Sequence, residues 1–347
     1  MRARIDRTLS EFLARQRELL STVDATATIP VADAVADFVL RGGKRLRPAF
    51  AYWGFRGAGG ADSDELVATV AALEFVQASA LIHDDVMDGS DTRRGQPAIH
   101  RRFAELHRAQ GWHGDPDRFG TAAAILLGDL CLVWSDELLH SSGLPPETLA
   151  RARPVFDQMR TEVSLGQYLD VLTQATGDTT VERALQVARL KSGKYTVERP
   201  LQFGAALAGA PPAVIAAYAG YGLPLGEAFQ LRDDVLGLFG DPSVTGKPAG
   251  DDLREGKRTY LVATALAAAG PADRATLSSR LGDPTLDEAG VAELLRIITD
   301  TGALARTEQR ISELTAAALA ALGTAPIEPV AAEALTALAA AATIRTG

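Results

Sequence analysis

Apolar residues recur at a spacing of three to four positions along most of this 347-residue chain. That spacing is the period of an α-helix with one apolar face. Alternating apolar and polar positions, the signature of a half-buried strand, do not form convincing runs. The pattern therefore predicts an all-α protein. Its clearest helices cover residues 9–23, 61–82, 121–140, 145–172, 180–193, 211–240, 286–323 and 329–343.

Breaks between these helices predict how the chain is organised. Glycine, proline and aspartate cluster at residues 111–120 and 240–252, which we expect to form polar loops. No shift in composition marks a linker, and no repeat of solenoid length is present. We therefore expect a single domain over residues 1–347, built as one large bundle of about a dozen helices.

Composition narrows the class of protein. Hydrophobic residues make up 47% of the chain, enough for a large core, and the net charge of −9 disfavours nucleic acid as a partner. The single cysteine, Cys131, excludes an internal disulfide and fits a reducing compartment. The N-terminus lacks the unbroken apolar core of a signal peptide, and no apolar run suggests a membrane span. We expect a soluble, cytoplasmic protein.

An acidic cluster interrupts the apolar pattern in LIHDDVMDGSDTRRGQPAIH, residues 81–100. Asp84 and Asp88 are four residues apart, so on a helix they lie on one face, with Asp85 between them in sequence. Carboxylates at the mouth of a buried helix are unfavourable unless a cation compensates them. Oxygen ligands alone suit a hard cation such as Mg²⁺. His83 is turned about 100° away around the helix, and we expect it to serve in packing or to support the metal ligands from behind.

A second acidic pair, Asp233 and Asp234, ends another apolar helical stretch about 150 residues later. Two helices of this kind could face each other across a cleft and hold several Mg²⁺ ions, which usually accompany a phosphorylated ligand. Neither cluster has the spacing of an EF-hand calcium loop. Each pair alone could be an ordinary solvated helix end, but two clusters that both end buried helices argue against that interpretation.

Basic residues supply the charge that a bound phosphate would need. In RGGKRLRP, two glycines precede Lys44, Arg45 and Arg47, and glycine lets a backbone approach a phosphate closely. Arg93 and Arg94 follow the first acidic cluster. Further basic positions are Lys191, Lys247 and Lys257. No Walker A motif is present, which disfavours a P-loop nucleotide hydrolase.

These motifs together resemble, in order, those of the trans-prenyltransferases, the short- and medium-chain isoprenyl diphosphate synthases of the polyprenyl synthetase family. The matching segments are GGKRLRP, LIHDDVMDGSDTRRGQPAIH, GD, GQYLD, KSGKYT and FQLRDDVLGLFGD with GKPAGDDLREGK, between about residues 40 and 260. The resemblance implies an all-α bundle around a central apolar cavity. It also implies a homodimer that binds three Mg²⁺ ions and condenses isopentenyl diphosphate with dimethylallyl, geranyl or farnesyl diphosphate.

The resemblance also implies a role for each matching position. The Mg²⁺ ligands would be Asp84, Asp88, Asp170, Asp233 and Asp234, with Asp85 in support. The allylic diphosphate would be bound by Arg93, Lys191 and Lys247, and isopentenyl diphosphate by Lys44, Arg47, Arg94 and Gln77. Further contacts would come from Gln167, Ser192, Gln230 and Lys257. The catalytic set would be Asp84, Asp85, Asp88, Arg93, Lys191, Asp233 and Lys247.

One position departs from the family pattern. Gly237 stands where many members carry a third aspartate in the second cluster. We expect activity to survive, because the first acid of that cluster is the usual direct ligand. The implied reaction is ionisation of the allylic diphosphate, condensation and loss of a proton, for which the released diphosphate can serve as the base.

Small residues one turn before Asp84 bear on the length of the product. Ser79 and Ala80 stand where aromatic residues in the family stop growth at fifteen carbons, and Val76 lies a further turn below. We therefore expect mainly the C20 product, geranylgeranyl diphosphate. The alternatives are a farnesyl or longer-chain synthase, a class I terpene cyclase and a non-catalytic subunit of a heteromeric synthase.

Overall fold

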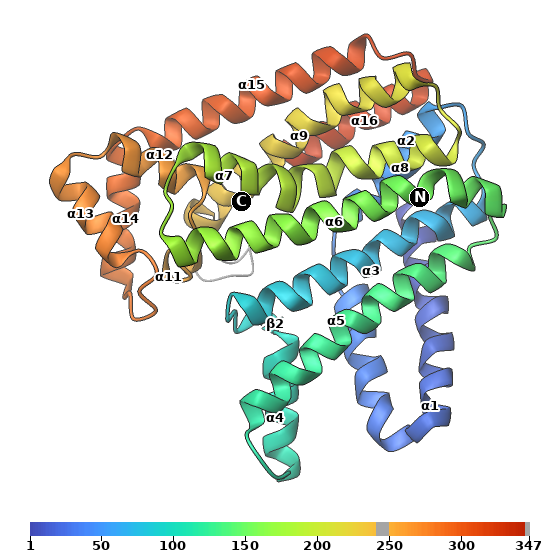
Figure 1. Cartoon of the computed structure of the whole chain (residues 1–347), viewed down its shortest axis with the longest axis horizontal. Coiled ribbons are helices and arrows are strands. Elements are labelled where there is room, and N and C mark those ends of the chain that lie inside the picture. The colour runs from blue at the N-terminus through green and yellow to red at the C-terminus, as the bar shows by residue number, and fades with distance from the viewer. Residues whose placement is uncertain (241–249, 344–347) are drawn as a thin grey trace.

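The computed structural model describes residues 1–240 and 250–343, apart from the side chains of residues 25–29, and it confirms the predicted all-α class (Figure 1). Its N-terminal half comprises α1 (Arg2–Leu40), α2 (Leu46–Gly57), α3 (Asp64–Met87), α4 (Ile99–Gln110), α5 (Pro116–His140) and α6 (Pro146–Thr176). The remainder comprises α7 (Val181–Val187), the π-helix η1 (Ala188–Glu198), α8 (Arg199–Leu207), α9 (Pro212–Phe239), α11 (Asp251–Arg254), α12 (Tyr260–Ala268), α13 (Pro271–Arg280), α14 (Glu288–Asp300), α15 (Ala303–Gly323) and α16 (Pro329–Thr343).

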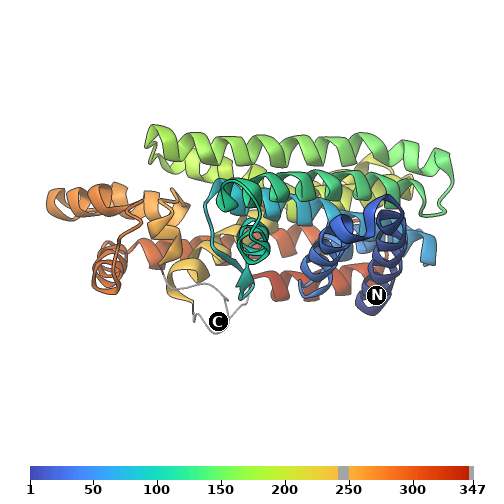
Figure 2. The same cartoon turned by 90° about the horizontal axis from the view of Figure 1, so that it is seen from below.

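Long helices form the body of the molecule. Helix α3 packs against α5, α1 and α2, while α9 packs against α15 and η1 and α6 packs against η1 and α8. Figure 2 shows α5 and α6 along one face, with α1 and α16 toward the other. Helices α12, α13 and α14 form a smaller cluster at the end of the bundle near the start of α15 (Figure 1). The helices that carry the two acidic clusters, α3 and α9, therefore both lie within the bundle.

Local sequence signals explain where the central helices start. Ser63 caps α3 by accepting a hydrogen bond of 3.1 Å from the backbone N–H of Leu66. Asp115 caps α5, whose first residue is Pro116, and accepts a hydrogen bond of 3.0 Å from the N–H of Asp117. Because α5 begins there, the predicted loop at 111–120 is wrong in its second half.

One predicted helix is interrupted, and another continues beyond its predicted end. The stretch 286–323 is two helices, α14 and α15, because Gly302 between them adopts a left-handed backbone with φ of 73°. Helix α1 contains a kink at Asp24, whose φ of −162° and ψ of 100° are not helical. An ion pair of 2.8 Å between Arg17 and Asp33 joins its two halves. Apolar periodicity continues across the break at Gly302 and therefore did not reveal it. The helix predicted over residues 9–23 ends one residue before the kink, so the second half of α1 was not predicted.

A small hairpin follows α3, although the sequence predicts no strand. β1 (Thr92–Arg93) pairs with β2 (Gln96–Pro97) in an antiparallel ladder. The two turn residues, Arg94 and Gly95, both have positive φ, 54° and 71°, as a type I′ hairpin turn requires. Strands of two residues are too short to produce an alternating pattern. The hairpin places Arg93 and Arg94 next to the acidic end of α3.

Helix α3 is long and apolar enough to cross a membrane by length and composition, but 72% of that apolar window is buried within the fold. Phe75 on this helix packs against Phe12 at 5.2 Å and Trp134 at 6.1 Å between ring centroids. Such burial is typical of a core helix, since a membrane span must present apolar side chains to lipid. This agrees with the expectation of no membrane span.

Candidate active site

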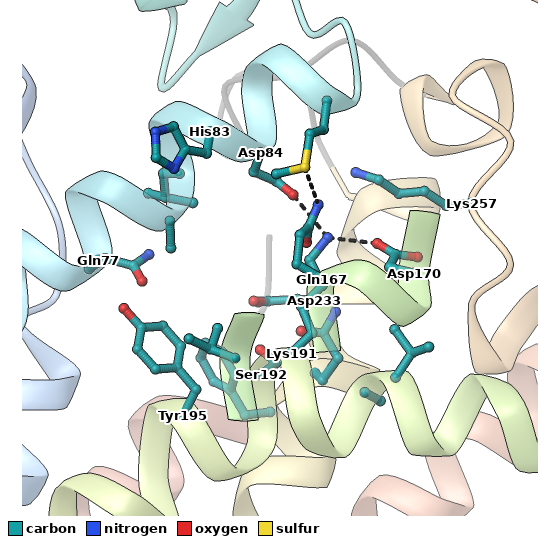
Figure 3. A pocket seen from close by; sticks show the side chains of 18 of the residues that line it. Gln77, His83, Asp84, Gln167, Asp170, Lys191, Ser192, Tyr195, Asp233 and Lys257 are labelled. Atoms are coloured by element: carbon teal, nitrogen blue, oxygen red, sulfur yellow. Dashed lines mark hydrogen bonds and ion pairs between the residues drawn. The ribbon is translucent and has the colours of Figure 1, made fainter. Parts of the chain in front are cut away.

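A cavity of about 1680 Å³ lies between α3, α6, η1 and α9. Figure 3 shows side chains from all four helices pointing into it. Most of the residues proposed from the sequence line this cavity: Lys44, Arg47, Val76, Gln77, Ser79, Ala80, Asp84, Arg93, Arg94, Gln167, Asp170, Lys191, Ser192, Gln230, Asp233, Asp234 and Lys257. Asp85 and Asp88 lie beside it, and Lys247 lies outside the described residues.

Lys191 joins the first acidic cluster to α6. Its Nζ donates hydrogen bonds of 2.9 Å to Asp84 Oδ1 and 2.7 Å to Asp170 Oδ2 (Figure 3). Burial opposes the charge of Lys191, but the two carboxylates outweigh it and raise its pKa. Burial alone would raise the pKa of Asp84, yet Lys191, Lys257 and Arg93 lower it overall. Asp84 is therefore ionised and Lys191 charged at neutral pH.

The π-helix η1 presents Lys191 and Ser192 to the cavity, while Gly166 of α6 permits its close approach. A Cβ on Gly166 would overlap the backbone nitrogen of Lys191. Helices with an i→i+5 hydrogen-bond pattern are rare and are frequent at functional sites. Gly166 of the GQYLD motif and the π-helix formed by the KSGKYT segment therefore together fix the position of Lys191.

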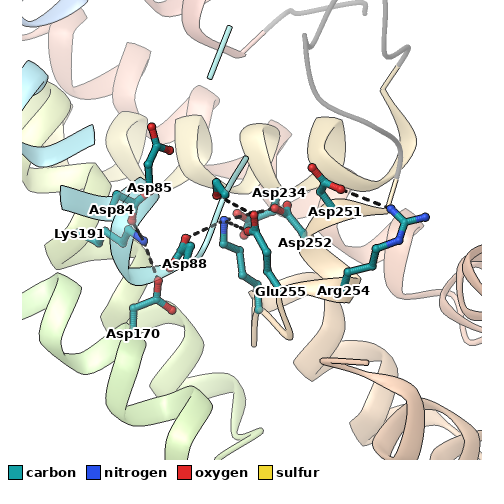
Figure 4. Close-up of polar contacts among 12 residues, drawn as sticks. Asp84, Asp85, Asp88, Asp170, Lys191, Asp234, Asp251, Asp252, Arg254 and Glu255 are labelled. Atoms are coloured by element: carbon teal, nitrogen blue, oxygen red, sulfur yellow. Dashed lines mark hydrogen bonds and ion pairs between the residues drawn. The ribbon is translucent and has the colours of Figure 1, made fainter. Parts of the chain in front are cut away.

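Lys257 links the end of α3 to the segment after α9. Its Nζ lies 3.2 Å from Asp88 Oδ2, 3.4 Å from Asp252 Oδ1 and 2.7 Å from Glu255 Oε2 (Figure 4). Burial would lower the pKa of Lys257, but these carboxylates raise it well above its usual value. Burial and the charge of Asp84 raise the pKa of Asp88. Carboxylates thus exceed cations around Lys257.

The second acidic cluster faces the same cavity from α9. Asp233 points into it near Lys191 (Figure 3). Asp234 is buried and accepts a hydrogen bond of 2.7 Å from Gln230 Nε2. Burial, with the charges of Asp252 and Asp233, raises the pKa of Asp234 to about 8. The two helices that carry the acidic clusters therefore converge on one space.

Gly237 leaves room for a carboxylate from elsewhere in the chain. A Cβ on Gly237 would overlap Asp252 Oδ2 and lie 3.1 Å from its Cγ. A third aspartate at position 237, as in many family members, would therefore collide with Asp252. The sequence analysis quoted Asp252 within GKPAGDDLREGK but gave it no role. Nothing in the motif itself indicated that the Asp252 side chain lies beside Gly237 of α9.

Arg93 is held by the acids it follows in sequence. Its guanidinium donates to Asp85, through Nε at 2.8 Å and also through Nη2, and lies 3.4 Å from Asp84 Oδ2. Burial opposes the charge of Arg93, but Asp85 raises its pKa. Asp85 is fully buried and does not line the cavity itself. Its contact with Arg93 instead orients that cation at the cavity wall.

A second basic group lies on the Gln77 side of the cavity. Lys44, Arg47, Arg94 and Gln77 all line it. Arg47 Nη2 donates a hydrogen bond of 2.7 Å to Thr196 Oγ1, and its guanidinium lies 4.2 Å from the centre of the Tyr195 ring. Tyr195, which sequence reasoning missed, is buried and faces Gln77 (Figure 3). The cavity thus has two separate sets of cationic side chains.

Small and apolar side chains line much of the rest of the cavity. Val76, Ser79 and Ala80 lie on the face of α3 that lines it, as expected from their spacing. Phe75, the residue before Val76, instead turns away from the cavity and packs in the aromatic cluster of the core. Adjacent helix positions differ by about 100°, which accounts for the difference.

The donor set suits magnesium. The side chains facing the cavity that could bind a cation through a negative charge are carboxylates, and hard cations prefer oxygen ligands. Buried Asp88 Oδ2 accepts no hydrogen bond from the described residues and has only the ion pair with Lys257. Within residues 1–240 and 250–343, no three acidic, histidine or cysteine side chains converge closely enough to hold a metal by themselves. The carboxylates that line the cavity thus offer the oxygen ligands that Mg²⁺ takes up together with substrate phosphates.

Comparisons with known proteins agree with this geometry. The family model for polyprenyl synthetase matches residues 30–298. A geranylfarnesyl diphosphate synthase of Aeropyrum pernix is 33% identical over 284 residues, covering 81% of this chain and 83% of that protein. A geranylgeranyl diphosphate synthase of Methanosarcina mazei is 33% identical over 263 residues, covering 76% of this chain and 74% of that protein.

A solved structure extends the similarity to nearly the whole chain. The crystal structure of geranylgeranyl pyrophosphate synthase from Corynebacterium glutamicum, in complex with isoprenyl diphosphate and magnesium, is 43% identical. It superposes with a TM-score of 0.94 and covers 98% of this chain and 97% of that one.

Proposed function

The chain belongs to the polyprenyl synthetase family and is an isoprenyl diphosphate synthase; from this premise we propose that it makes mainly geranylgeranyl diphosphate. The substrates are isopentenyl diphosphate and an allylic diphosphate, either dimethylallyl, geranyl or farnesyl diphosphate. The observation that carries the proposal is the convergence of Asp84 and Asp233 on one cavity that also holds a second, separate basic group.

The acidic end of the cavity binds the allylic diphosphate. Arg93, Lys191 and Lys257 supply positive charge there, and each is already oriented by a carboxylate. Donors that are preorganised around a leaving group stabilise the charge that develops on it, which is the main source of catalysis in such sites. Lys247 is proposed to join them on the basis of its motif alone.

Three Mg²⁺ ions would complete this end of the cavity. Asp84 and Asp88 would hold ions on the α3 side with support from Asp170, and Asp233 would hold an ion on the α9 side with Asp234 nearby. The excess of buried carboxylate around Lys257 supports this assignment. Bound Mg²⁺ supplies Lewis-acid stabilisation of the departing diphosphate.

The other end of the cavity binds isopentenyl diphosphate through Lys44, Arg47, Arg94 and Gln77. Arginine offers paired hydrogen bonds to phosphate oxygens, and lysine offers a mobile point charge. This arrangement aims the isopentenyl double bond at the allylic carbon. Apolar walls exclude water from the reactive carbon, so that the attack of the double bond competes with hydrolysis. No side chain is assigned as the base; the released diphosphate takes the proton.

Small residues below Asp84 support the C20 product. Ser79 and Ala80 leave the cavity open toward Val76, so a chain of fifteen carbons has space to accept one more unit. Each helical turn rises about 5.4 Å, close to the length of one isoprene unit. The similarity to geranylgeranyl diphosphate synthases supports the same length.

We further propose that residues 1–347 form one catalytic domain that acts as a cytoplasmic homodimer. Exposed apolar side chains on α5 and α6 support association through that face: Ile125, Leu126, Val133, Leu165 and Tyr168. Light scattering of the purified chain tests the dimer, because a monomer would contradict it.

Product analysis tests the proposed reaction. The purified chain is incubated with labelled isopentenyl diphosphate and each allylic starter, with and without Mg²⁺, and the dephosphorylated products are separated by chromatography. We expect C20 alcohol from all three starters and none without metal. Turnover of an allylic diphosphate that does not consume isopentenyl diphosphate would instead identify a terpene cyclase. Inactivity of the single chain would indicate a subunit of a heteromeric enzyme.

A further inference from the structure

Glu74 of α3 is a buried carboxylate at the meeting point of two arginines. It is 7% exposed, and its Oε2 accepts a hydrogen bond of 2.5 Å from Arg45 Nη1. Arg45 is also buried, and it donates from Nε to Asp6 at 2.9 Å and from Nη2 to the carbonyl of Val39 at 2.8 Å. Glu74 and Arg45 thus join α3 to the start of α2 and to both halves of α1.

The backbone around this carboxylate is strained in two places. Arg45 and Arg94 have φ of 53° and 54°, and among the described residues they are the only non-glycine residues with positive φ. Residues other than glycine keep this left-handed conformation only where the surroundings hold it. Arg45 precedes α2, while Arg94 lies in the hairpin turn, so the two strained residues come from different segments.

Both arginine side chains approach the same point next to Glu74. A Cβ on Gly43 would lie 3.5 Å from Arg45 Nη1, 3.6 Å from Arg94 Nη2 and 3.8 Å from Glu74 Oε2. Burial lowers the pKa of Arg94, the charge of Glu74 opposes this, and the neighbouring charge of Arg45 adds to it. Glu74 therefore provides the negative charge that lets the buried guanidinium of Arg45 and the more exposed side chain of Arg94 lie close together.

The same segments carry the basic group of the second diphosphate site. Lys44 and Arg47 flank Arg45 in sequence, and both line the cavity together with Arg94. We propose that Glu74 is a positioning residue: it fixes Arg45 and Arg94 so that Lys44, Arg47 and Arg94 face one diphosphate. This inference rests on the proposed function, which assigns that group to isopentenyl diphosphate.

A matched control exists elsewhere in the fold. Glu227 is 2% exposed and accepts hydrogen bonds of 2.8 Å from both Arg189 and Arg310. It is as buried as Glu74 and equally engaged with arginine, but it does not line the cavity. If only the loss of a buried ion pair matters, Glu74→Gln and Glu227→Gln should change the kinetic constants in the same way. If Glu74 positions the basic group, only Glu74→Gln should weaken the binding of isopentenyl diphosphate.

Steady-state kinetics with each substrate varied separately, in wild type, Glu74→Gln and Glu227→Gln, test the proposal. We expect Glu74→Gln to raise the KM for isopentenyl diphosphate about tenfold and to leave the KM for the allylic substrate within about twofold. Glu227→Gln should leave both constants near wild type. The proposal is overturned if Glu74→Gln leaves the KM for isopentenyl diphosphate unchanged, lowers it, or raises both constants equally.

Calorimetry separates this inference from the proposed function. Isopentenyl diphosphate is titrated into each protein without an allylic substrate, so the readout does not require turnover. Wild type that binds it but forms no product contradicts the proposed function, while weaker binding by Glu74→Gln still supports the positioning role. Glu74→Asp, which keeps the charge but shortens the side chain, should also weaken binding. If Glu74→Gln does not fold, the Glu74→Asp variant tests the proposal in its place. Glu74→Asp that binds isopentenyl diphosphate as tightly as wild type would contradict the positioning role.

Discussion

Gly237 and Asp252 occupy a shared space in the second acidic cluster: a Cβ on Gly237 would overlap Asp252 Oδ2. Asp252 comes from the segment after α9, and Lys257 holds it at 3.4 Å. The carboxylate of Asp252 thus lies where a side chain at position 237 would begin. A larger residue at position 237 must therefore displace the side chain of Asp252.

Introducing the aspartate of the family pattern should harm this enzyme. Gly237→Asp displaces Asp252 from Lys257 and adds a carboxylate to a site already rich in them, so we expect a lower kcat and a higher Mg²⁺ requirement. The change should be about tenfold or more, as for disruption of a buried charged network. Gly220→Ala is the matched control on α9, since its Cβ would meet only Ala321 at 3.5 Å. Higher activity of Gly237→Asp would contradict this prediction and would show that the second acidic cluster lacks a useful third aspartate.

Filling the cavity below Asp84 should shorten the product. Ala80 lines the cavity one turn from Asp84, so Ala80→Phe places a ring in the path of the growing chain. We expect farnesyl diphosphate to replace geranylgeranyl diphosphate as the main product, measured by chromatography of the dephosphorylated products. Phe75→Ala serves as the contrast, because Phe75 faces the core; it should reduce stability by about 3–5 kcal/mol without lengthening the product. An unchanged product from Ala80→Phe would refute the assignment of the cavity to the growing chain.

Magnesium and diphosphate should stabilise the fold together more than separately. No three acidic, histidine or cysteine side chains converge on one metal position in the part of the chain that the structure describes. Mg²⁺ alone should therefore raise Tm little, and Mg²⁺ with inorganic diphosphate should raise it by more than the sum of the separate shifts, because ligands that bind only the folded state stabilise it. Thermal unfolding by circular dichroism measures this, with EDTA as the reversal. A full shift with Mg²⁺ alone would contradict joint binding.

The ion pair between Glu162 and Arg199 should make stability depend on pH. Arg199 donates hydrogen bonds of 2.7 Å to both carboxylate oxygens of Glu162. Burial would raise the pKa of Glu162, but Arg199 and Lys194 outweigh it and lower the pKa. A lowered pKa stabilises the fold above the unfolded value of about 4.3, and that stabilisation is lost as pH falls through the lower folded value.

Urea unfolding of wild type and Glu162→Gln at pH 7 and below pH 4 measures this contribution. Wild type should be more stable at pH 7, and the difference should shrink as the pH falls. Glu182→Gln, at an exposed position on α7, is the control and should change neither midpoint. A difference that stays constant with pH would mean that the charge of Glu162 contributes nothing.

Much of the fold could be predicted because helical periodicity and helix-start signals are local. Ser63 caps its helix through the next few residues, so its effect is local in sequence. The cap at Asp115 is equally local but was missed, because the glycine, proline and aspartate around it predicted a loop. The break at Gly302 was missed because apolar spacing continues through it, and the second half of α1, beyond the kink at Asp24, was not predicted. The hairpin around Arg94 was missed because two-residue strands leave no pattern.

The site was predicted unevenly for the same reason. Acid pairs and basic motifs are contiguous, so Asp84, Lys191 and Asp233 could be singled out and do line one cavity. Asp252 and Glu74 gain their importance only from contacts across the fold. A single sequence does not reveal that Asp252 fills the space beside Gly237 or that Glu74 receives Arg45 from 29 positions earlier.

The central claim is that the acids of α3 and α9 act on one leaving group. Diphosphate release from the allylic substrate, measured in wild type, Asp84→Asn, Asp233→Asn and the double variant, tests it most directly. Each single change should lower the rate about 10²–10³-fold, and because both acids serve the same departing group, the double variant should be little slower than the slower single variant. Near-normal release by Asp233→Asn, or losses that multiply in the double variant, would contradict the claim.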